Sequence, residues 1–308
     1  MHRVLVLLST YNGERFVKEQ LDSLLAQIGV DVTVMVRDDG SKDQTCAILK
    51  EYSAKHSNII VDFASNVGCA NSFGNLLLSA HDKINEFDYF AFSDQDDVWL
   101  PEKLSKACSF LVGKPNDKPL LYCSNLNVVD QNLSKIGLKW TGNAYPTKGQ
   151  SLVCSMATGC TMVFNPCVVD TFFNYQPRSM VLHDLWVFHL CMFLGEVVFD
   201  NDSYILYRQH GGNVVGAKLT FKAKIKSKYN SFLTLKSQHD NELEAKELLR
   251  CYGSILPEND KKLISVVANY RNSLTNRLRF LFRIGDAKGI DRLVDNHVLN
   301  YRIILGCV

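Results

Sequence analysis

This 308-residue chain lacks several features that would assign it to well-defined protein classes. No apolar run reaches the roughly 18 residues that a membrane-spanning helix needs. The first residues, MHRVLVLLSTYNGE, lack the small-residue cleavage site of a signal peptide. The ten cysteines form no CxxC pair and no cysteine–histidine pattern of a zinc site. We therefore expect a cytoplasmic protein whose thiols are reduced.

Glycine-rich phosphate-binding loops are also missing. A dinucleotide-binding fold would place GxGxxG after its first strand, and a P-loop nucleotidase would place GxxxxGKS there. Here the first apolar run is followed by Ser-Thr-Tyr-Asn-Gly-Glu, residues 9–14. If this chain binds phosphates, another group must neutralise their charge.

Charge is distributed unevenly along a chain of ordinary composition, with 46% hydrophobic and 21% charged residues. Residues 1–217 contain 17 Lys and Arg against 23 Asp and Glu, a net charge of −6, whereas residues 218–308 contain 17 against 9, a net charge of +8. The difference predicts a boundary near residue 217 and different partners for the two regions. A basic surface without any partner is the alternative interpretation.

Short apolar runs alternate with segments of helical periodicity over the first 123 residues. We expect strands at residues 4–8, 32–36, 59–63, 89–92 and 120–123. Helices are expected between them, for example over 14–27 and 70–81. This alternation indicates an α/β fold with a mostly parallel sheet, which binds ligands at the carboxyl ends of its strands.

The remainder of the chain is less regular. We expect a mixed extension of the sheet, with a strand at 160–164, a helix over 182–193, and two strands at 197–200 and 203–207. Beyond residue 218, a lysine run is followed by apolar residues at three- and four-residue steps over 263–281 and 290–305. This spacing predicts two amphipathic helices in a basic, mainly α-helical C-terminal region over 218–308.

An acidic cluster follows the expected strand at 89–92 directly. Asp94, Asp96 and Asp97 place three carboxylates within four residues, and such carboxylates repel one another unless a cation lies among them. Oxygen ligands suit Mg²⁺ or Mn²⁺, and a diphosphate would complete the coordination. A solvated acidic loop is the alternative, but the position after an apolar strand favours the metal site.

Two further acidic positions are less specific. Asp38 and Asp39 lie in an Asp-Asp-Gly-Ser turn, where a structural role is common. Their place at the same sheet edge permits a carboxylate that accepts the N3–H of a pyrimidine. Asp184 follows His183 at the start of an expected helix, where it is either a helix cap or a general base aimed at an acceptor hydroxyl.

Seven strings occur in a family-like order and spacing: LSTYNGERFVKEQLDSLLAQ, VMVRDDGSKDQT, NVG, SDQDDVWLPEKL, ATGCTMVF, HDLW and YRQHGGNVVG. Together they resemble glycosyltransferase family 2, in particular its bacterial rhamnosyltransferase-like members. The resemblance covers about residues 3–217 and implies a GT-A fold with an inverting, single-displacement transfer. It implies that 1–217 is the catalytic domain.

The resemblance also implies roles for individual residues. Thr10, Tyr11 and Asn12 would line the nucleotide pocket, and Asp39 would hold the pyrimidine ring. Asp94 would lie near the ribose and the metal.

The same resemblance implies that Asp96 is the principal metal ligand of a DxD motif and that Asp184 is the catalytic base. His210 lies where some members place a further ligand to metal or diphosphate. The chain departs from the commoner Glu-Asp pair by having His183 before Asp184, which leaves the role of His183 open.

Three side chains are candidate contacts to the diphosphate or the acceptor. Arg208 offers a fork of donors for phosphate oxygens. His183 and Trp186 neighbour the expected base, although a tryptophan more often packs in a core.

The donor and acceptor are less defined. The subgroup resemblance favours L-rhamnose from dTDP-rhamnose, moved to a hydroxyl of a glycan or lipid-linked glycan in bacterial surface polysaccharide (O-antigen-type) synthesis. UDP-galactose or UDP-glucose is the alternative donor. A sugar nucleotidyltransferase would carry GxGxRxxPxT near its first strand, which this chain lacks. A nucleic-acid-binding protein would interleave aromatic and basic residues in its basic region, and the C-terminal region of this chain lacks such interleaving.

The basic C-terminal region suggests a peripheral association with the cytoplasmic face of a bacterial inner membrane. Five lysines between residues 218 and 228 would be attracted to anionic lipid, at about 1 kcal/mol per basic residue near the surface. The alternative is that this region packs on the catalytic domain or forms the interface of a homodimer.

Overall fold

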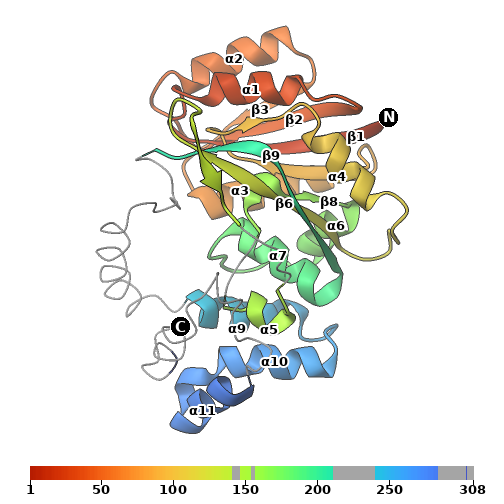
Figure 1. The fold of residues 1–308 in the computed structure, drawn as a ribbon, viewed down its shortest axis with the longest axis vertical. Coiled ribbons are helices and arrows are strands. Elements are labelled where there is room, and N and C mark those ends of the chain that lie inside the picture. Colours follow the sequence, from red (N-terminus) through yellow and green to blue (C-terminus); the bar gives the residue numbers. More distant parts are fainter. Residues whose placement is uncertain (141–145, 154–156, 211–239, 284–302, 304–308) are drawn as a thin grey trace. The chain divides into compact units, whose positions relative to one another are not determined.

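The computed structural model describes residues 1–140, 146–153, 157–210, 240–283 and 303. They belong to two compact units, which are coloured along the chain in Figure 1. Unit 1 takes its described residues from 1–143, 157–174 and 182–215, and unit 2 from 144–156, 175–181 and 216–308. The functional division into a catalytic domain over 1–217 and a separate C-terminal region stays a prediction.

Unit 1 is built on a nine-stranded sheet with the order β3-β2-β1-β4-β8-β6-β9-β5, and β7 pairs with β6. Its first four strands are parallel: β1 (His2–Thr10), β2 (Val30–Asp38), β3 (Ile59–Phe63) and β4 (Tyr89–Ser93). Residues 4–8 of β1 are completely buried, as an apolar central strand of a parallel sheet should be. The predicted α/β fold with a parallel core is confirmed.

The other strands make the mixed extension. They are β5 (Val98–Trp99), β6 (Leu120–Val129), β7 (Lys135–Leu138), β8 (Val163–Phe164) and β9 (Glu196–Arg208). The two strands predicted at 197–200 and 203–207 are one strand, β9, whose pairing with β6 shifts register after Asp200. The strand predicted at 160–164 is shorter, because residues Gly159–Thr161 form a 3₁₀ turn before β8.

The helices of unit 1 cover both faces of the sheet. Helices α1 (Val17–Leu25) and α2 (Thr45–Lys55) lie on one side in Figure 1, and α3 (Cys69–His81), α6 (Pro166–Asn174) and α7 (His183–Leu194) lie on the other. Helix α4 (Lys103–Leu111) packs on β6 and β9.

The strand order reverses at β1, since β2 and β3 lie on one side of it and β4 lies on the other. Such a switch point opens a ligand site at the carboxyl ends of the strands.

Unit 2 contains α5 (Lys148–Ser151), α9 (Asp240–Tyr252), α10 (Glu258–Ala268), a 3₁₀ turn (Tyr270–Asn272) and α11 (Leu274–Arg283). The helix predicted over 263–281 is thus broken. Asn269 ends α10 with its side chain bonded to the Ser265 carbonyl (3.0 Å), and the Ser273 hydroxyl accepts a bond from the Asn276 amide (3.1 Å) at the start of α11. Residues 218–228 and, apart from Ile303, the helix predicted over 290–305 lie outside the described residues. None of the described helices combines the length and apolarity needed to cross a bilayer.

Candidate active site

The turns after β1 and β4 are joined at the switch point by one side chain. The Gln95 amide accepts a hydrogen bond from the Tyr11 amide (2.9 Å) and donates one to the Tyr11 carbonyl (3.0 Å). Asn12 adopts a positive φ of 48°, which its short polar side chain tolerates, and it bonds to the backbone of Lys42 (2.9 Å). These contacts fix the exposed Tyr11 at the edge where the nucleotide pocket is predicted.

Asp38 and Asp39 are both buried and hydrogen-bonded. Asp38 accepts bonds from Thr10 Oγ1 (2.9 Å) and from the amide and hydroxyl of Ser41. Asp39 pairs with Arg37 and accepts bonds from the amides of residues 67 and 68, both at 2.9 Å. Asp39 therefore shapes the turn after β3. Its Oδ2 accepts one of these bonds and can accept another, so its predicted contact with a pyrimidine stays a prediction.

The acidic cluster forms the turn between β4 and β5. Asp96 Oδ2 lies 2.8 Å from His210 Nε2, and the His210 ring packs on Phe16 with 4.9 Å between ring centroids. Burial, together with the charges of Asp96 and Asp184, raises the pKa of Asp94 to about 7. Carboxylates that repel one another in this way are stabilised when a cation joins them.

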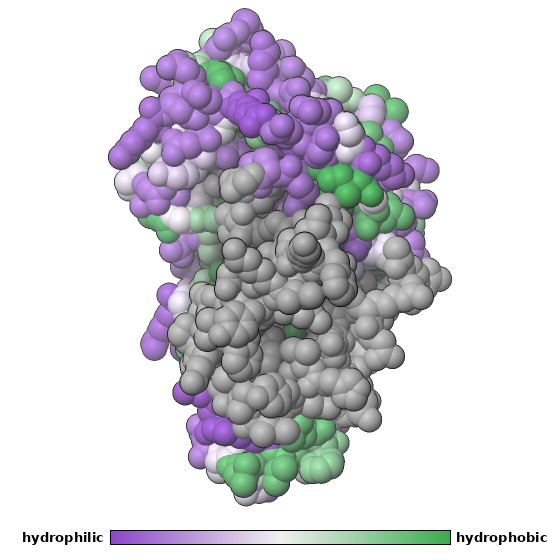
Figure 2. Space-filling view, turned by 60° about the vertical axis from the view of Figure 1, so that its left-hand side comes forward, coloured by the Kyte–Doolittle hydropathy of each residue, from purple (hydrophilic) through white to green (hydrophobic). Residues whose placement is uncertain are grey.

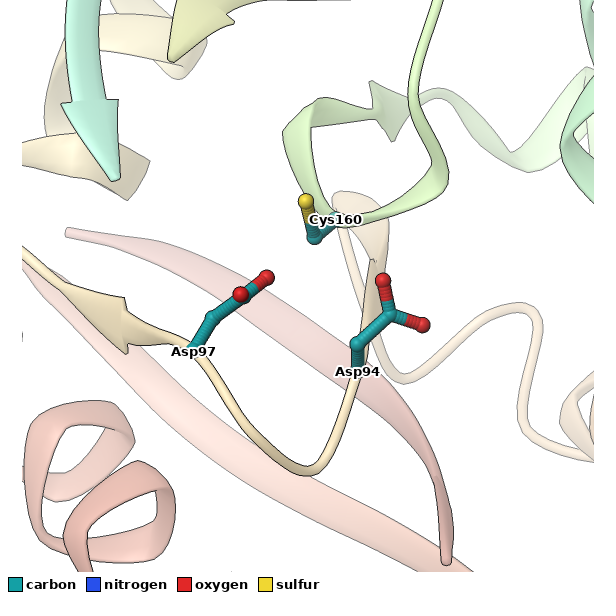
Figure 3. Close-up of side chains that lie close together, drawn as sticks. All are labelled: Asp94, Asp97 and Cys160. Atoms are coloured by element: carbon teal, nitrogen blue, oxygen red, sulfur yellow. The ribbon is translucent and has the colours of Figure 1, made fainter. Parts of the chain in front are cut away.

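Asp97 lies deeper than its neighbours. It is completely buried, its Oδ1 accepts a bond from the Arg208 amide (3.1 Å), and its carboxylate also interacts with the Cys160 thiol. Figure 3 shows the carboxyl groups of Asp94 and Asp97 on the side of the turn where Cys160 lies, and ligand atoms of the three residues are within 4.8 Å of one another. Burial first, and then the charges of Asp96 and Asp94, raises the pKa of Asp97.

The carboxylates of this turn suit a hard divalent cation such as Mg²⁺ or Mn²⁺. Asp94 and Asp97 bring their oxygens close together, whereas Asp96 contacts His210, so metal binding by Asp96 and His210 stays a prediction. Cys160 suits such an ion poorly, because burial holds the pKa of its thiol well above the usual value and a thiol is a soft ligand. Cys160 is completely buried and packs as a small core residue.

Asp184 lies in the first turn of α7 and is held by two backbone amides. Its Oδ2 accepts a bond from the Gly159 amide (3.1 Å), and its Oδ1 accepts one from the Leu185 amide (2.8 Å). The 3₁₀ turn that replaces the start of the predicted strand thus presents an amide to this carboxylate. The N-cap residue of α7 is Leu182, and Asp184 lies in the first turn, where its bond to the Leu185 amide also stabilises the start of the helix; its role as the base stays a prediction.

His183 is buried between aromatic rings. Its ring stacks on Phe73 (3.7 Å between centroids) and meets Phe92 edge-on (4.8 Å), and among the described residues neither ring nitrogen has a hydrogen-bond partner. A side chain at Gly159 would come within 2.9 Å of its Nε2. The ring therefore packs in the core beside Asp184, and the predicted contact of His183 with the diphosphate or acceptor stays a prediction.

This burial predicts a pH-dependent stability. Burial lowers the pKa of His183 to about 4, although Asp184 opposes the shift, so between pH 6.5 and 4 the unfolded chain binds the extra proton. The free energy of unfolding should therefore decrease as the pH is lowered from 6.5 to 4, by about 3 kcal/mol in total for this group. Urea unfolding should show a weaker pH dependence for His183→Phe than for the wild type. If the free energy of unfolding depends on pH equally in both proteins, His183 is not neutral in the folded state. His56→Phe serves as the control.

Arg208 and Trp186 are likewise buried. The Arg208 guanidinium is buried and bonds to the carbonyls of Asp96 (2.8 Å) and Gln131 (2.7 Å) and to the Glu19 carboxylate. It therefore holds the acidic turn. Trp186 is completely buried and packs in the core beneath α7. The predicted contacts of these two side chains with the diphosphate or the acceptor stay predictions.

Sequence reasoning missed Lys139, which lies just after β7. Its Nζ donates to Thr158 Oγ1 (2.6 Å), and its charge acts on Asp184 and Asp94. No motif marks this lysine, because it reaches the site only through the β6–β7 hairpin. Arg37 was missed as well, although a single basic residue in an apolar strand is a detectable signal.

Comparisons with known proteins agree with the predicted family resemblance and fold. Residues 5–147 match the family described as "Glycosyl transferase family 2". The dTDP-rhamnosyl transferase RfbG of Shigella flexneri is 29% identical over 238 residues, covering 71% of this chain and 77% of the relative. The crystal structure of S. aureus TarS 1–349 in complex with UDP-GlcNAc superposes with a TM-score of 0.58 at 16% identity, over 98% of this chain and 89% of that one.

A second solved structure is the mannosyltransferase PcManGT of Pyrobaculum calidifontis in complex with GDP-Man and Mn²⁺. It gives a TM-score of 0.52 at 13% identity and covers 99% of this chain and 84% of that one. At such identities the two structures establish the fold alone, and that fold is the GT-A type.

Proposed function

We propose that this chain, whose residues 5–147 match glycosyl transferase family 2, is an inverting, metal-dependent glycosyltransferase acting from a nucleotide-diphosphate sugar. One observation carries this proposal. Two backbone amides fix Asp184, and the charge of Asp184 helps to raise the pKa of Asp94. This supports the proposed base and a proposed metal ligand as parts of one site.

The mechanism uses these residues in one displacement. Asp184 accepts the proton of the acceptor hydroxyl as its oxygen attacks the anomeric carbon. The bond between that carbon and the diphosphate breaks on the opposite side, so the configuration inverts. Asp94, Asp96 and His210 would hold a divalent cation, which when bound stabilises the negative charge of the leaving diphosphate.

The favoured donor is dTDP-L-rhamnose, with UDP-galactose and UDP-glucose as alternatives. The likeness to a dTDP-rhamnosyl transferase supports the first. The test incubates the enzyme with each sugar nucleotide and a bacterial lipid-linked glycan fraction as acceptor and measures release of the nucleoside diphosphate, with Asp184→Asn as the control. Release from dTDP-L-rhamnose alone, lost in the variant, is the expected result. Release that the variant retains would contradict the proposed base.

We further propose that the acceptor is a glycan or lipid-linked glycan at the cytoplasmic face of a bacterial inner membrane, in surface polysaccharide synthesis. Helix α11 supports this. Leu274, Leu278 and Phe282 recur every four residues on it and are 68, 43 and 81% exposed, so they lie along one face. Residues 269–283 hold four arginines and no acidic residue. Figure 2 shows hydrophobic surface at the lower end of unit 2, where α11 lies.

Replacing two of these apolar residues should weaken membrane binding. Leu274→Ser with Phe282→Ser removes side chains worth about 1.5–3 kcal/mol each when buried, so binding to vesicles containing phosphatidylglycerol should fall at least tenfold. Co-sedimentation measures this, and vesicles of phosphatidylcholine alone should bind weakly. Leu243→Ser, exposed on α9, is the matched control. Equal binding of the two vesicle types would exclude the exposed face of α11 as a site for anionic membranes. A concentration-dependent dimer that the double variant abolishes would assign this face to a homodimer interface instead.

A further inference from the structure

Lys139 is held in place by contacts from two directions. The Asn125 side chain donates to the Trp140 carbonyl (2.9 Å) and accepts from the Trp140 amide (3.1 Å), which fixes the backbone after β7. The Lys139 ammonium donates to Thr158 Oγ1 (2.6 Å). Thr158 directly precedes Gly159, whose amide holds Asp184. The lysine and the predicted base are therefore positioned by the same short turn.

The surroundings of the Lys139 ammonium are acidic. Burial lowers the pKa of Lys139, and Cys160, Asp184, Asp94 and Asp97 oppose that shift, with Asp184 the strongest of the three carboxylates. The turn to which it bonds joins these groups, because the Gly159 amide holds Asp184 and the Cys160 sulfur lies within 4.8 Å of carboxylate oxygens of Asp94 and Asp97. The ammonium has three N–H donors, and in the described part of the chain Thr158 Oγ1 is its single hydrogen-bond acceptor. Its Nζ also lies 5.3 and 5.8 Å from the ring centroids of Trp140 and Tyr207, and these contacts leave N–H donors for ligand oxygens.

The proposed reaction defines which ligand part lies there. An in-line displacement places the transferred sugar between the base on one side and the diphosphate on the other. Asp184 marks the first side, and Asp94 belongs to the turn that would hold the diphosphate. A cation acting on both residues faces the sugar ring between them.

We propose that Lys139 is a specificity-determining residue that donates hydrogen bonds to hydroxyl oxygens of the donor sugar. The inference rests on the proposed function and deepens it. It predicts that Lys139 discriminates a sugar nucleotide from the bare nucleoside diphosphate, because only the former brings hydroxyls to this position.

The test is Lys139→Met, which keeps the length of the side chain but removes its charge. Calorimetry would measure the affinities for dTDP and dTDP-L-rhamnose, and for UDP and UDP-galactose, with Mg²⁺ or Mn²⁺. The variant should bind the sugar nucleotide about 10- to 100-fold more weakly, as expected for lost hydrogen bonds from a charged group. Its affinity for the nucleoside diphosphate should stay within about twofold of the wild type.

Two further variants keep the test decisive. Thr158→Val removes the acceptor of the ammonium without removing its charge, so the affinity for the sugar nucleotide should fall by less than in Lys139→Met while the affinity for the nucleoside diphosphate stays unchanged. Lys135 is exposed on β7, and Lys135→Met should bind both ligands like the wild type. Equal loss of both ligands would place Lys139 at the diphosphate, and unchanged binding with a lower kcat would reduce it to a positioning residue for Asp184. Either result overturns the inference. A wild type that binds neither ligand would refute the proposed function itself.

Discussion

Asp184→Asn should lower kcat by about 10²- to 10⁴-fold while the affinity for the nucleoside diphosphate changes by less than twofold. Asparagine is nearly isosteric, and its one oxygen can accept one of the two bonds that the amides of Gly159 (3.1 Å) and Leu185 (2.8 Å) donate to separate carboxylate oxygens. It cannot accept the proton of the acceptor hydroxyl. The change therefore removes the base and one of its two backbone contacts.

Single-turnover transfer and calorimetry with the same protein samples separate the two effects. Asp31→Asn is a matched control, because Asp31 is exposed near the amino end of β2, at the opposite edge of the sheet from the site. Wild-type turnover in Asp184→Asn would remove Asp184 from the mechanism. A loss of nucleotide affinity as large as the loss of turnover would show that Asp184 shapes the donor site and is not the base.

Asp96→Asn should lower kcat/KM by at least about 10³-fold and abolish the metal dependence of nucleotide binding, since a bound cation stabilises the transition-state charge by several kcal/mol. Asn can still bond to His210, whose Nε2 lies 2.8 Å from Asp96 Oδ2, so the turn should keep its conformation. The variant removes one charged metal ligand. Titration of Mn²⁺ in the presence of dTDP or UDP measures the effect.

Asp97→Asn is the informative comparison for this experiment. Burial raises the pKa of Asp97, which favours its uncharged form, and its Oδ1 contact with the Arg208 amide is one that asparagine reproduces. This variant should retain metal-dependent binding. Equal losses in Asp96→Asn and Asp97→Asn would show that the ion is bound by the buried group formed by Asp94, Asp97 and Cys160.

The sequence predicted best the features that depend on chain direction and hydrophobic pattern. Apolar runs predicted the parallel strands β1 to β4, and the carboxyl ends of three of them carry the turns of Tyr11, Asp39 and Asp94. Once the strands are parallel, these turns must share one sheet edge. This is why the place of the site could be predicted without knowledge of its contacts.

Side-chain direction was predicted less well. Three side chains lie near the expected site in the sequence but are directed elsewhere. Arg208 bonds to the acidic turn, His183 packs on Phe73, and Trp186 lies in the core. Proximity along the chain does not determine which way a side chain points. Lys139 is far from Asp184 in the sequence but close enough to it in the fold for the two charges to interact. The pairing of β6 with β7 brings the two together across 45 residues, and no local sequence pattern predicts this proximity.

The most direct test of a nucleotide-diphosphate and metal site is the thermal stability of the purified protein with dTDP, UDP, GDP, ADP and CDP, each with Mn²⁺, Mg²⁺ or EDTA. A ligand present at about 100 times its Kd stabilises the folded state by about 2.7 kcal/mol, which shifts Tm by several degrees. We expect such a rise with dTDP or UDP in the presence of metal, and its loss in EDTA and in Asp96→Asn. No rise with any of the five nucleotides under any metal condition would contradict the proposed function.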